Sequence, residues 1–449
     1  MLLLAVFFLT AAAAAPQTLD ALAARLERLE RQNAELAEQV RLLRQELQRG
    51  RQQPDTPAAR LDALEEKVDL HAGRIAEHDQ IKVEGTNRTS IRLTGMALFN
   101  LFRTSRHYGG TLFVTPIAAS NTPGRITSAA TMRQSVVGLE FQAPEAIYGG
   151  QFRGSVFLDL ISGAETTLFT SPRLRTASIE GQWKSRGFLV GQEKPIFSAR
   201  LPNSLANVDV APLVGAGNLW LWRPQAWFEQ RFSLGSSQQF RARIGISQTS
   251  EGSGTIQPQF AAAREPRRPA LEGHFQFTHR IDDFRRIEIA HGFHHSTTHV
   301  AGLDIPANLF SFDGFANPIR RLEFTGVFWT GKNLSKLGGI GAARGFVISI
   351  PRPGELLAVP VRSQGGWAQV SWLATSRLTF NLYGGIHDFN DRDVLPGDPA
   401  RNRAYAANFF YRLAPNVLSG LEASQVRTRF PGGRNPLLNH YNLYVAYLF

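Results

Sequence analysis

From about Val83 to the C-terminus, apolar and polar residues alternate along the chain with a period of two. The same alternation recurs near residues 151–160, 240–247, 271–278, 321–328 and 378–387. In the final stretch the alternate apolar positions are Tyr441, Leu443, Val445, Tyr447 and Phe449. A period of two predicts β-strands, and stretches of about ten residues match the length that crosses a bilayer at a tilt of about 45°.

Alternation alone fits a soluble sandwich as well as a membrane barrel, because either fold has one apolar face per strand. Three features favour the barrel: about fourteen or fifteen predicted strands, a chain that ends on an aromatic residue, and aromatic residues near strand ends. These aromatics are Trp220, Trp222, Trp227, Trp367, Trp372, Tyr441 and Tyr447. The predicted fold is therefore an all-β transmembrane β-barrel over residues 83–449. Sixteen antiparallel strands are favoured at roughly 23 residues per strand with its connection, and fourteen or eighteen stay open.

The first 82 residues follow different patterns. Residues 1–15 are apolar and end in small residues, which predicts a cleaved signal peptide. Over residues 17–53, leucines recur at spacings of three and four with Asn33 on the same seam, which predicts an α-helical coiled coil. Residues 54–82 repeat the pattern more weakly and form a second short helical segment or linker. The seam favours a homotrimer without excluding a dimer.

Composition excludes several classes of protein. The chain has no cysteine, so disulfide frameworks and thiolate metal sites are ruled out. No run of about eighteen apolar residues follows residue 15, which rules out a helical membrane protein. Two groups were considered for chemistry, and neither supports an enzyme or a cofactor: Asp282 and Asp283, and the histidines His291, His294, His295 and His299.

Positive charge is concentrated in the predicted barrel. Residues 17–85 hold 11 basic and 14 acidic side chains, whereas the rest of the chain holds 38 and 23, and only 6 of the 49 basic residues are lysine. Guanidinium groups pair with carboxylates and phosphates, which suits a lumen that passes anions. Arginines that bind lipopolysaccharide at the rim, or that pair with lumenal acids, are the alternatives. A nucleic-acid partner is not expected, because the basic residues lie in alternating strands of a secreted chain.

Strand parity assigns candidate pore-lining residues to the polar face. Arg241 and Arg243 lie about 7 Å apart on one strand and are expected to bind a short dicarboxylate, with Glu229 or Glu272 as a compensating acid. Residues 194–219 lack alternation and are expected to form a loop that constricts the pore, with Asp209 as counter-charge; a loop that covers the mouth or packs on a neighbouring subunit is the alternative. The predicted anion-binding residues are Arg153, Arg231, Arg241, Arg243, Arg321, Lys194 and Arg200.

Four short segments carry a resemblance to a known family: Met132–Phe141, Gly150–Gly154, Leu174–Glu180 and Val190–Gln192. Together with the order of signal peptide, coiled coil and arginine-rich barrel, they resemble the DcaP-like outer-membrane porins, whose architecture is similar to that of phosphate-selective porins. Val136 stands where that family usually has a second arginine. The resemblance implies a homotrimer of sixteen-stranded barrels with a periplasmic coiled coil, passing small anions such as dicarboxylates or phosphate.

The functional prediction is therefore an outer-membrane porin in a Gram-negative-type bacterium, with outer-membrane lipid, lipopolysaccharide and small anionic solutes as partners. A sugar porin is the main rival and requires a row of lumenal aromatics, for which parity offers Trp227, Phe157, Tyr383 and Tyr444. A structural tether that joins the outer membrane to the periplasmic cell wall is the second rival. Conductance separates a tether from either kind of porin.

Overall fold

The computed structural model describes residues 41, 83–84, 90–105, 117–118, 126–143, 148–162, 170–208, 210–249, 268–338 and 344–449, and all structural statements concern these residues. The predicted signal peptide, the coiled coil apart from Arg41, the second helical segment and Asp209 lie outside them. Two compact units divide the chain, residues 1–80 with 84–88 and residues 81–83 with 89–449, and the barrel belongs to the second. No helix in the described part of the chain is long and apolar enough to cross a membrane.

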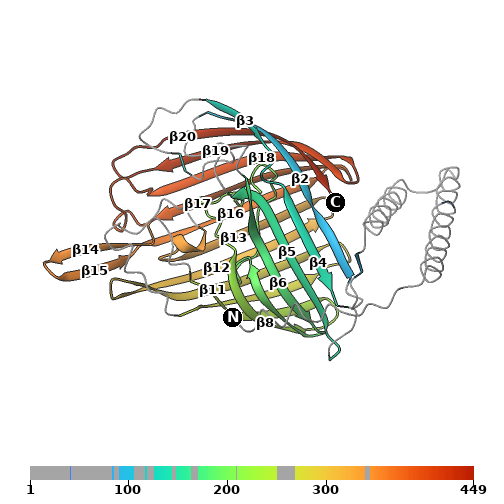
Figure 1. The fold of residues 1–449 in the computed structure, drawn as a ribbon, viewed down its shortest axis with the longest axis horizontal. Coiled ribbons are helices and arrows are strands. Elements are labelled where there is room, and N and C mark those ends of the chain that lie inside the picture. Colours follow the sequence, from blue (N-terminus) through green and yellow to red (C-terminus); the bar gives the residue numbers. More distant parts are fainter. Residues whose placement is uncertain are drawn as a thin grey trace, which may run out of the picture. The chain divides into compact units, whose positions relative to one another are not determined.

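Sixteen antiparallel strands close into a barrel, as predicted (Figure 1). The last strand pairs with the first, so that Tyr444 lies opposite Asn100. β3 and β4 together form one barrel strand, because they pair with the two ends of β2. After the two-residue β1 (Val83–Glu84), the barrel strands are β2 (Ser90–Thr104), β3 (Thr127–Thr131), β4 (Val136–Gln142), β5 (Gln151–Ser162), β6 (Ser171–Gln182), β7 (Arg186–Glu193), β8 (Arg223–Ser233), β9 (Gln238–Ser247), β10 (Ala270–Arg280), β11 (Arg286–Val300), β12 (Leu303–Ile319), β13 (Leu322–Lys332), β16 (Arg362–Leu373), β17 (Leu378–Phe389), β18 (Arg401–Ala414), β19 (Val417–Arg429) and β20 (Leu437–Leu448).

The apolar face of each strand points outward. On β20, Tyr441, Leu443, Val445 and Tyr447 are 42–52% exposed, whereas Asn442 and Tyr444 are 1% and 0% exposed. An apolar exterior around a polar interior is the arrangement of a membrane barrel and the reverse of a soluble sandwich.

The aromatic girdle is only partly as predicted. Trp372, Tyr441 and Tyr447 are about half exposed on the outer face. Trp220, Trp227 and Trp367 are buried at 7% exposure or less, so their assignment to the girdle is wrong. The reason for the two strand residues is parity. Trp227 and Glu229 lie on the inward face of β8, and Trp367 and Gln369 lie on the inward face of β16.

The two ends of the barrel differ in their connections. One end, here called the short-turn end, has connections such as residues 320–321 and 415–416, and Phe449 pairs there with Gly95 through both backbone groups at 2.8 and 3.2 Å. The other, the long-loop end, has connections such as residues 194–222 and 333–361. The latter contains η2 (Ser335–Leu337) and the hairpin of β14 (Phe346–Arg352) and β15 (Glu355–Pro360), which extends past the neighbouring strands (Figure 1).

Candidate pore constriction

The connection between β7 and β8, residues 194–222, folds into the barrel. Its backbone bonds to inward-facing side chains of strands on all sides: Ile196 N–H donates to Glu272 on β10 at 3.0 Å, and Val208 C=O accepts from Arg175 on β6 at 2.7 Å. The structure therefore confirms that this loop lies inside the barrel. It does not confirm the two alternatives, a loop that covers the mouth or one that packs on a neighbouring subunit. We call residues 194–222 the lumen loop.

Mostly uncharged side chains hold the lumen loop on one half of the interior, where Glu422 is an exception and accepts from Ser204 at 2.6 Å. We call this half, the inner face of β13, β16–β20 and β2, the amide wall. Asn100 donates to Leu205 C=O at 2.8 Å, and Asn408 donates to Asn203 C=O at 2.9 Å. Further contacts come from Gln369 to Asn203 N–H at 2.7 Å and from Asn402 to Gly215 C=O at 2.9 Å.

The interruption between β3 and β4 supplies another anchor. Gln134, which is fully buried there, accepts from Val208 N–H at 2.6 Å and donates to Ala206 C=O at 3.1 Å. Arg133 fixes the interruption by donating to the carbonyls of Ile161 and Ser162, each at 2.8 Å. The arginine of the family-like segment 132–141 therefore lies in the wall and binds backbone.

Apolar contacts also hold the lumen loop against the amide wall. Phe197 and Leu213 belong to a buried cluster with Trp329 and Trp367 of the amide wall. Trp329 Nε1–H donates to Gly217 C=O at 2.7 Å. Gly217 has φ +99°, and a Cβ there would lie 2.1 Å from the carbonyl oxygen of Gly366, so only glycine permits this close approach.

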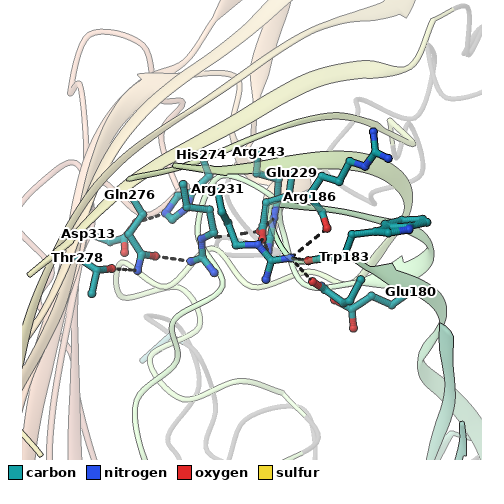
Figure 2. Close-up of polar contacts among 12 residues, drawn as sticks. Glu180, Trp183, Arg186, Glu229, Arg231, Arg243, His274, Gln276, Thr278 and Asp313 are labelled. Carbon is teal, nitrogen blue, oxygen red and sulfur yellow. Dashed lines mark hydrogen bonds and ion pairs between the residues drawn. The ribbon is translucent and has the colours of Figure 1, made fainter. Parts of the chain in front are cut away.

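The other half of the interior, the inner face of β5–β12, carries charge, and we call it the charged wall. At its centre Glu229 is contacted by three arginines, of which Arg231 and Arg243 are labelled in Figure 2. Arg243 donates to its Oε2 at 2.7 and 3.1 Å, and Arg241 and Arg231 lie 3.8 and 3.6 Å from its oxygens. Arg243 also stacks on Trp227 at 3.9 Å. Three guanidinium groups thus share one carboxylate.

A second group repeats this plan on β5 and β6. The buried Asp159 is contacted by Arg173 at 2.6 Å and by Arg175 at 3.1 Å. Both guanidinium groups lie over the ring of Trp222, at 5.5 and 4.5 Å from its centroid. Carboxylate and indole together fix the two arginines and remove much of their rotational freedom.

Two further groups tie the lumen loop to the charged wall. Arg200 of the loop pairs with Glu288 on β11 at 2.7 Å and with Asp313 on β12, and Asp313 also bonds to His274 at 2.7 Å. Glu272 accepts from Arg223 at the start of β8 and bonds to His294 at 2.7 Å. These groups are close to charge balance and are structural contacts of the loop.

Burial separates the two signs of charge. The side chains of Asp159 and Glu229 are 0% and 3% exposed, whereas those of the arginines around them are 16–31% exposed. Five guanidinium groups are therefore presented to water over two covered carboxylates. An anion in the lumen meets positive charge first.

The predicted anion-binding residues divide into two sets. The structure brings together Arg231, Arg241, Arg243 and Arg200, and it confirms Glu229 as the compensating acid, directly opposite Arg243 in register. Glu272 pairs elsewhere, with Arg223.

The remaining predicted residues lie apart from this group. Arg153 is exposed near the short-turn end, opposite Glu180 in register. Arg321 lies in the turn between β12 and β13, because β13 begins at Leu322, and strand parity does not apply to it. Lys194 begins the lumen loop, where its carbonyl accepts from Gln225 at 2.6 Å.

Several site residues were missed by the sequence. Arg173 and Arg175 have the i, i+2 spacing that singled out Arg241 and Arg243, but a register shift between β5 and β6 interrupts the alternation there. Trp222 was assigned to the girdle although it stacks under both. The i, i+2 arginine signal could have found this pair.

The histidine cluster does not form a site. His294 points inward to Glu272, whereas His291 lies outward between Phe275 and Phe310, with ring centroids 5.0 and 5.3 Å away. His299 bonds to Asp304 at 2.5 Å. Among the described residues, no group of three His, Cys, Asp or Glu side chains is placed to hold a metal ion.

Known structures place this barrel in a fold class. No protein-family model matches the chain, and no curated protein does. The chain is similar to the crystal structure of the outer membrane channel DcaP of Acinetobacter baumannii, with a TM-score of 0.66 and 13% identity over 82% of this chain and 99% of that one. It is also similar to an anion-selective porin from Comamonas acidovorans, with a TM-score of 0.51 and 8% identity over 80% of this chain and 100% of that one.

The fold is thus that of a porin-type, sixteen-stranded barrel. More narrowly, its architecture is DcaP-like, as the sequence resemblance indicated.

Proposed function

We propose that this protein is an outer-membrane porin that passes small anionic solutes by passive diffusion through a channel bounded by the lumen loop and the charged wall. The observation that carries the proposal is the layering of charge, with exposed guanidinium groups over buried carboxylates. In a water-filled pore such a surface raises the local concentration of anions and lowers that of cations.

Small dianions, either dicarboxylates or phosphate, are the solutes that this surface fits best. Arg241 and Arg243 are separated by two positions on β9, and Arg231 reaches the same carboxylate from β8. Arginine forks bind carboxylate and phosphate oxygens in pairs. A solute with two negative charges can bridge neighbouring forks, whereas a monovalent anion engages one.

Reversal potentials across a planar bilayer in a potassium chloride gradient test the proposal. The wild type should prefer chloride, and Arg241→Ala/Arg243→Ala should lower the ratio of chloride to potassium permeability about sixteenfold, because each charge acts on the two ions with opposite sign. At roughly 8 Å in water each charge acts on a passing ion by about 0.5 kcal/mol, or about a factor of two.

The matched control is Arg320→Ala/Arg321→Ala, which removes the same charge from the short turn at residues 320–321. It should change selectivity less than the β9 pair does. Cation preference in the wild type, or equal effects of the two double variants, contradicts the proposal.

The sugar-porin alternative has little support. A sugar path needs accessible aromatic rings along the lumen, but Trp227, Tyr383 and Tyr444 are 7%, 4% and 0% exposed, and of the four candidates only Phe157 is partly exposed. Trp227 lies beneath Arg243, and Tyr444 packs with Leu98 near Leu205 of the lumen loop. Sugars should therefore leave the channel current nearly unchanged, while dicarboxylates should block it.

The proposal includes a homotrimer whose N-terminal residues 17–53 form a periplasmic coiled coil after removal of residues 1–15. The unbroken heptad seam supports this part, because a narrow apolar stripe associates with other helices.

Cross-linking in mild detergent should give a trimer that dissociates on heating, and deletion of residues 18–48 should leave barrels that still insert. A monomer in the intact protein contradicts the assembly but leaves the channel proposal standing. The tether alternative predicts no conductance.

A further inference from the structure

Two arginines face each other on the outer surface of the barrel at the long-loop end. Arg403 on β18 lies directly opposite Arg427 on β19 in register. Both point outward, because the residues before and after each of them are buried inside, with Asn402 and Thr428 fully buried. Like charges directly opposite in a sheet repel each other, so this pair is unfavourable unless an anion lies between the two groups.

The neighbouring arginine pair shows how the chain satisfies such charges elsewhere. One step toward the loops, Arg401 and Arg429 are also opposite each other, but Arg401 pairs with Asp388 and Arg429 with Asp391 at 2.6 Å. Among the described residues, the side chains of Arg403 and Arg427 have no hydrogen bond or ion pair. Two of the four guanidinium groups therefore lack the acid that the other two have.

The level of the pair along the barrel indicates what lies beside it. Tyr405, two residues closer to the short-turn end, is 52% exposed on the outer face, and Tyr411 marks the other end of the apolar stretch about 20 Å along the strand. On β20 the corresponding residues are Tyr441 and Tyr447. Exposed tyrosines mark the two interfaces of a bilayer, so the arginine pair lies just outside the hydrocarbon, among lipid headgroups.

We propose that Arg403 and Arg427 bind a phosphate group in the headgroup of a membrane lipid at the long-loop end. Two guanidinium forks side by side suit one phosphate, whose oxygens accept from both. The adjoining polar pair, Gln425 and Asn439, joined at 2.9 Å on the outer face, extends the surface with amide groups that fit headgroup hydroxyls. This inference rests on the proposed outer-membrane function, because it requires lipid around the barrel.

The test is native mass spectrometry of the full chain in detergent, titrated with diphosphorylated lipid A. Wild type should retain lipid A, and Arg403→Gln/Arg427→Gln should need about tenfold more of it for equal occupancy, because charge-assisted hydrogen bonds to phosphate are lost. The matched control is Arg377→Gln/Arg412→Gln, at the short-turn end of β17 and β18, which should bind like wild type. Dephosphorylated lipid A should bind wild type as weakly as lipid A binds the Gln variant.

Three results would overturn the site: equal lipid A binding by wild type and the Gln variant, displacement of lipid A by millimolar inorganic phosphate, or a loss of subunit association in the Gln variant with lipid binding intact. The second would indicate a free-anion site and the third a contact between copies.

Heat-modifiable migration on gels verifies folding. If the Gln variant does not fold, Arg403→Lys/Arg427→Lys keeps the charges, and it should bind lipid A with intermediate strength. Bilayer conductance of the same preparations is a separate measurement, so failure of the lipid site is distinguishable from failure of the porin proposal.

Discussion

The amide wall and the charged wall are built from the same inward-facing positions of one barrel, yet they use polarity differently. Asn100, Asn402 and Asn408 are buried, and each donates to a backbone carbonyl of the lumen loop. Arg241 and Arg243, in contrast, remain partly exposed to water above Glu229. Neutral amides can be buried at small cost once they are hydrogen-bonded, whereas guanidinium groups need both a counter-charge and water.

This difference shows that only part of the polar surface inside the barrel is available to a solute. On the amide wall, polar side chains replace the water that would otherwise solvate the loop backbone. On the charged wall, arginine side chains are held in place by buried acids and by Trp222 and Trp227, and they stay partly exposed to water. Four predictions separate these two roles.

The largest effect is expected on the amide wall. Asn100→Ala/Asn408→Ala leaves the buried carbonyls of Leu205 and Asn203 without donors, at about 1–3 kcal/mol each. The lumen loop should detach, giving noisier channels and trypsin cleavage after Arg200, which should be protected in the wild type. Arg241→Ala/Arg243→Ala should leave the loop resistant. Unchanged resistance in the Asn variant would show that apolar packing alone seats the loop.

On the charged wall, removal of the buried acid should have the opposite sign from removal of the arginines. Glu229→Gln deletes one negative charge beneath three guanidinium groups, so the permeability ratio of chloride to potassium should rise about fourfold. Reversal potentials measure this change. If selectivity falls instead, the main effect of Glu229 is to position the arginines rather than to subtract charge.

Salt should distinguish the walls without any mutation. Raising potassium chloride from about 0.1 to 1 M shortens the screening length from about 10 to 3 Å, which should erode anion selectivity. Protection of Arg200 from trypsin should persist, because most contacts of the amide wall are hydrogen bonds between uncharged groups, which salt does not screen. Loss of protection at high salt would assign loop anchoring to the ion pairs of Arg200 with Glu288 and Asp313.

The smallest effect is expected at the long-loop rim. The side chain of Arg362 holds the pKa of Asp393 below its usual range, through hydrogen bonds at 2.7 and 2.9 Å. A carboxyl group with a lowered folded pKa stabilises the fold above its ordinary pKa near 3.8, and that contribution is lost as the pH falls through the folded value. Hydrogen exchange in residues 390–400 should therefore be unchanged at pH 5 and faster only in stronger acid. Asp393→Asn should abolish this acid dependence.

Much of the fold and part of the site could be predicted from residue order alone. The period of two predicts which residues face the lumen, and it indicates Arg241 and Arg243 with Glu229 or Glu272 as the compensating acid. The structure decides for Glu229. Parity is a local property, since each side chain alternates with its neighbours whatever the rest of the chain does. Parity applies only within a regular strand. The parity prediction therefore fails at Arg321, which is in a turn, and at the register shift beside Arg175.

Only the tertiary structure decided which polar residues are solute-facing and which are buried. Gln134 and Gln369 resemble pore-lining residues in the sequence, but the lumen loop covers them. Asp159 and Glu229 share the polar faces of their strands with arginines, and only burial separates the covered acids from the exposed guanidinium groups. The physical reason is that exposure depends on contacts between segments far apart in the chain: Asn203 reaches Gln369 and Asn408 across the barrel, and no local pattern encodes that distance.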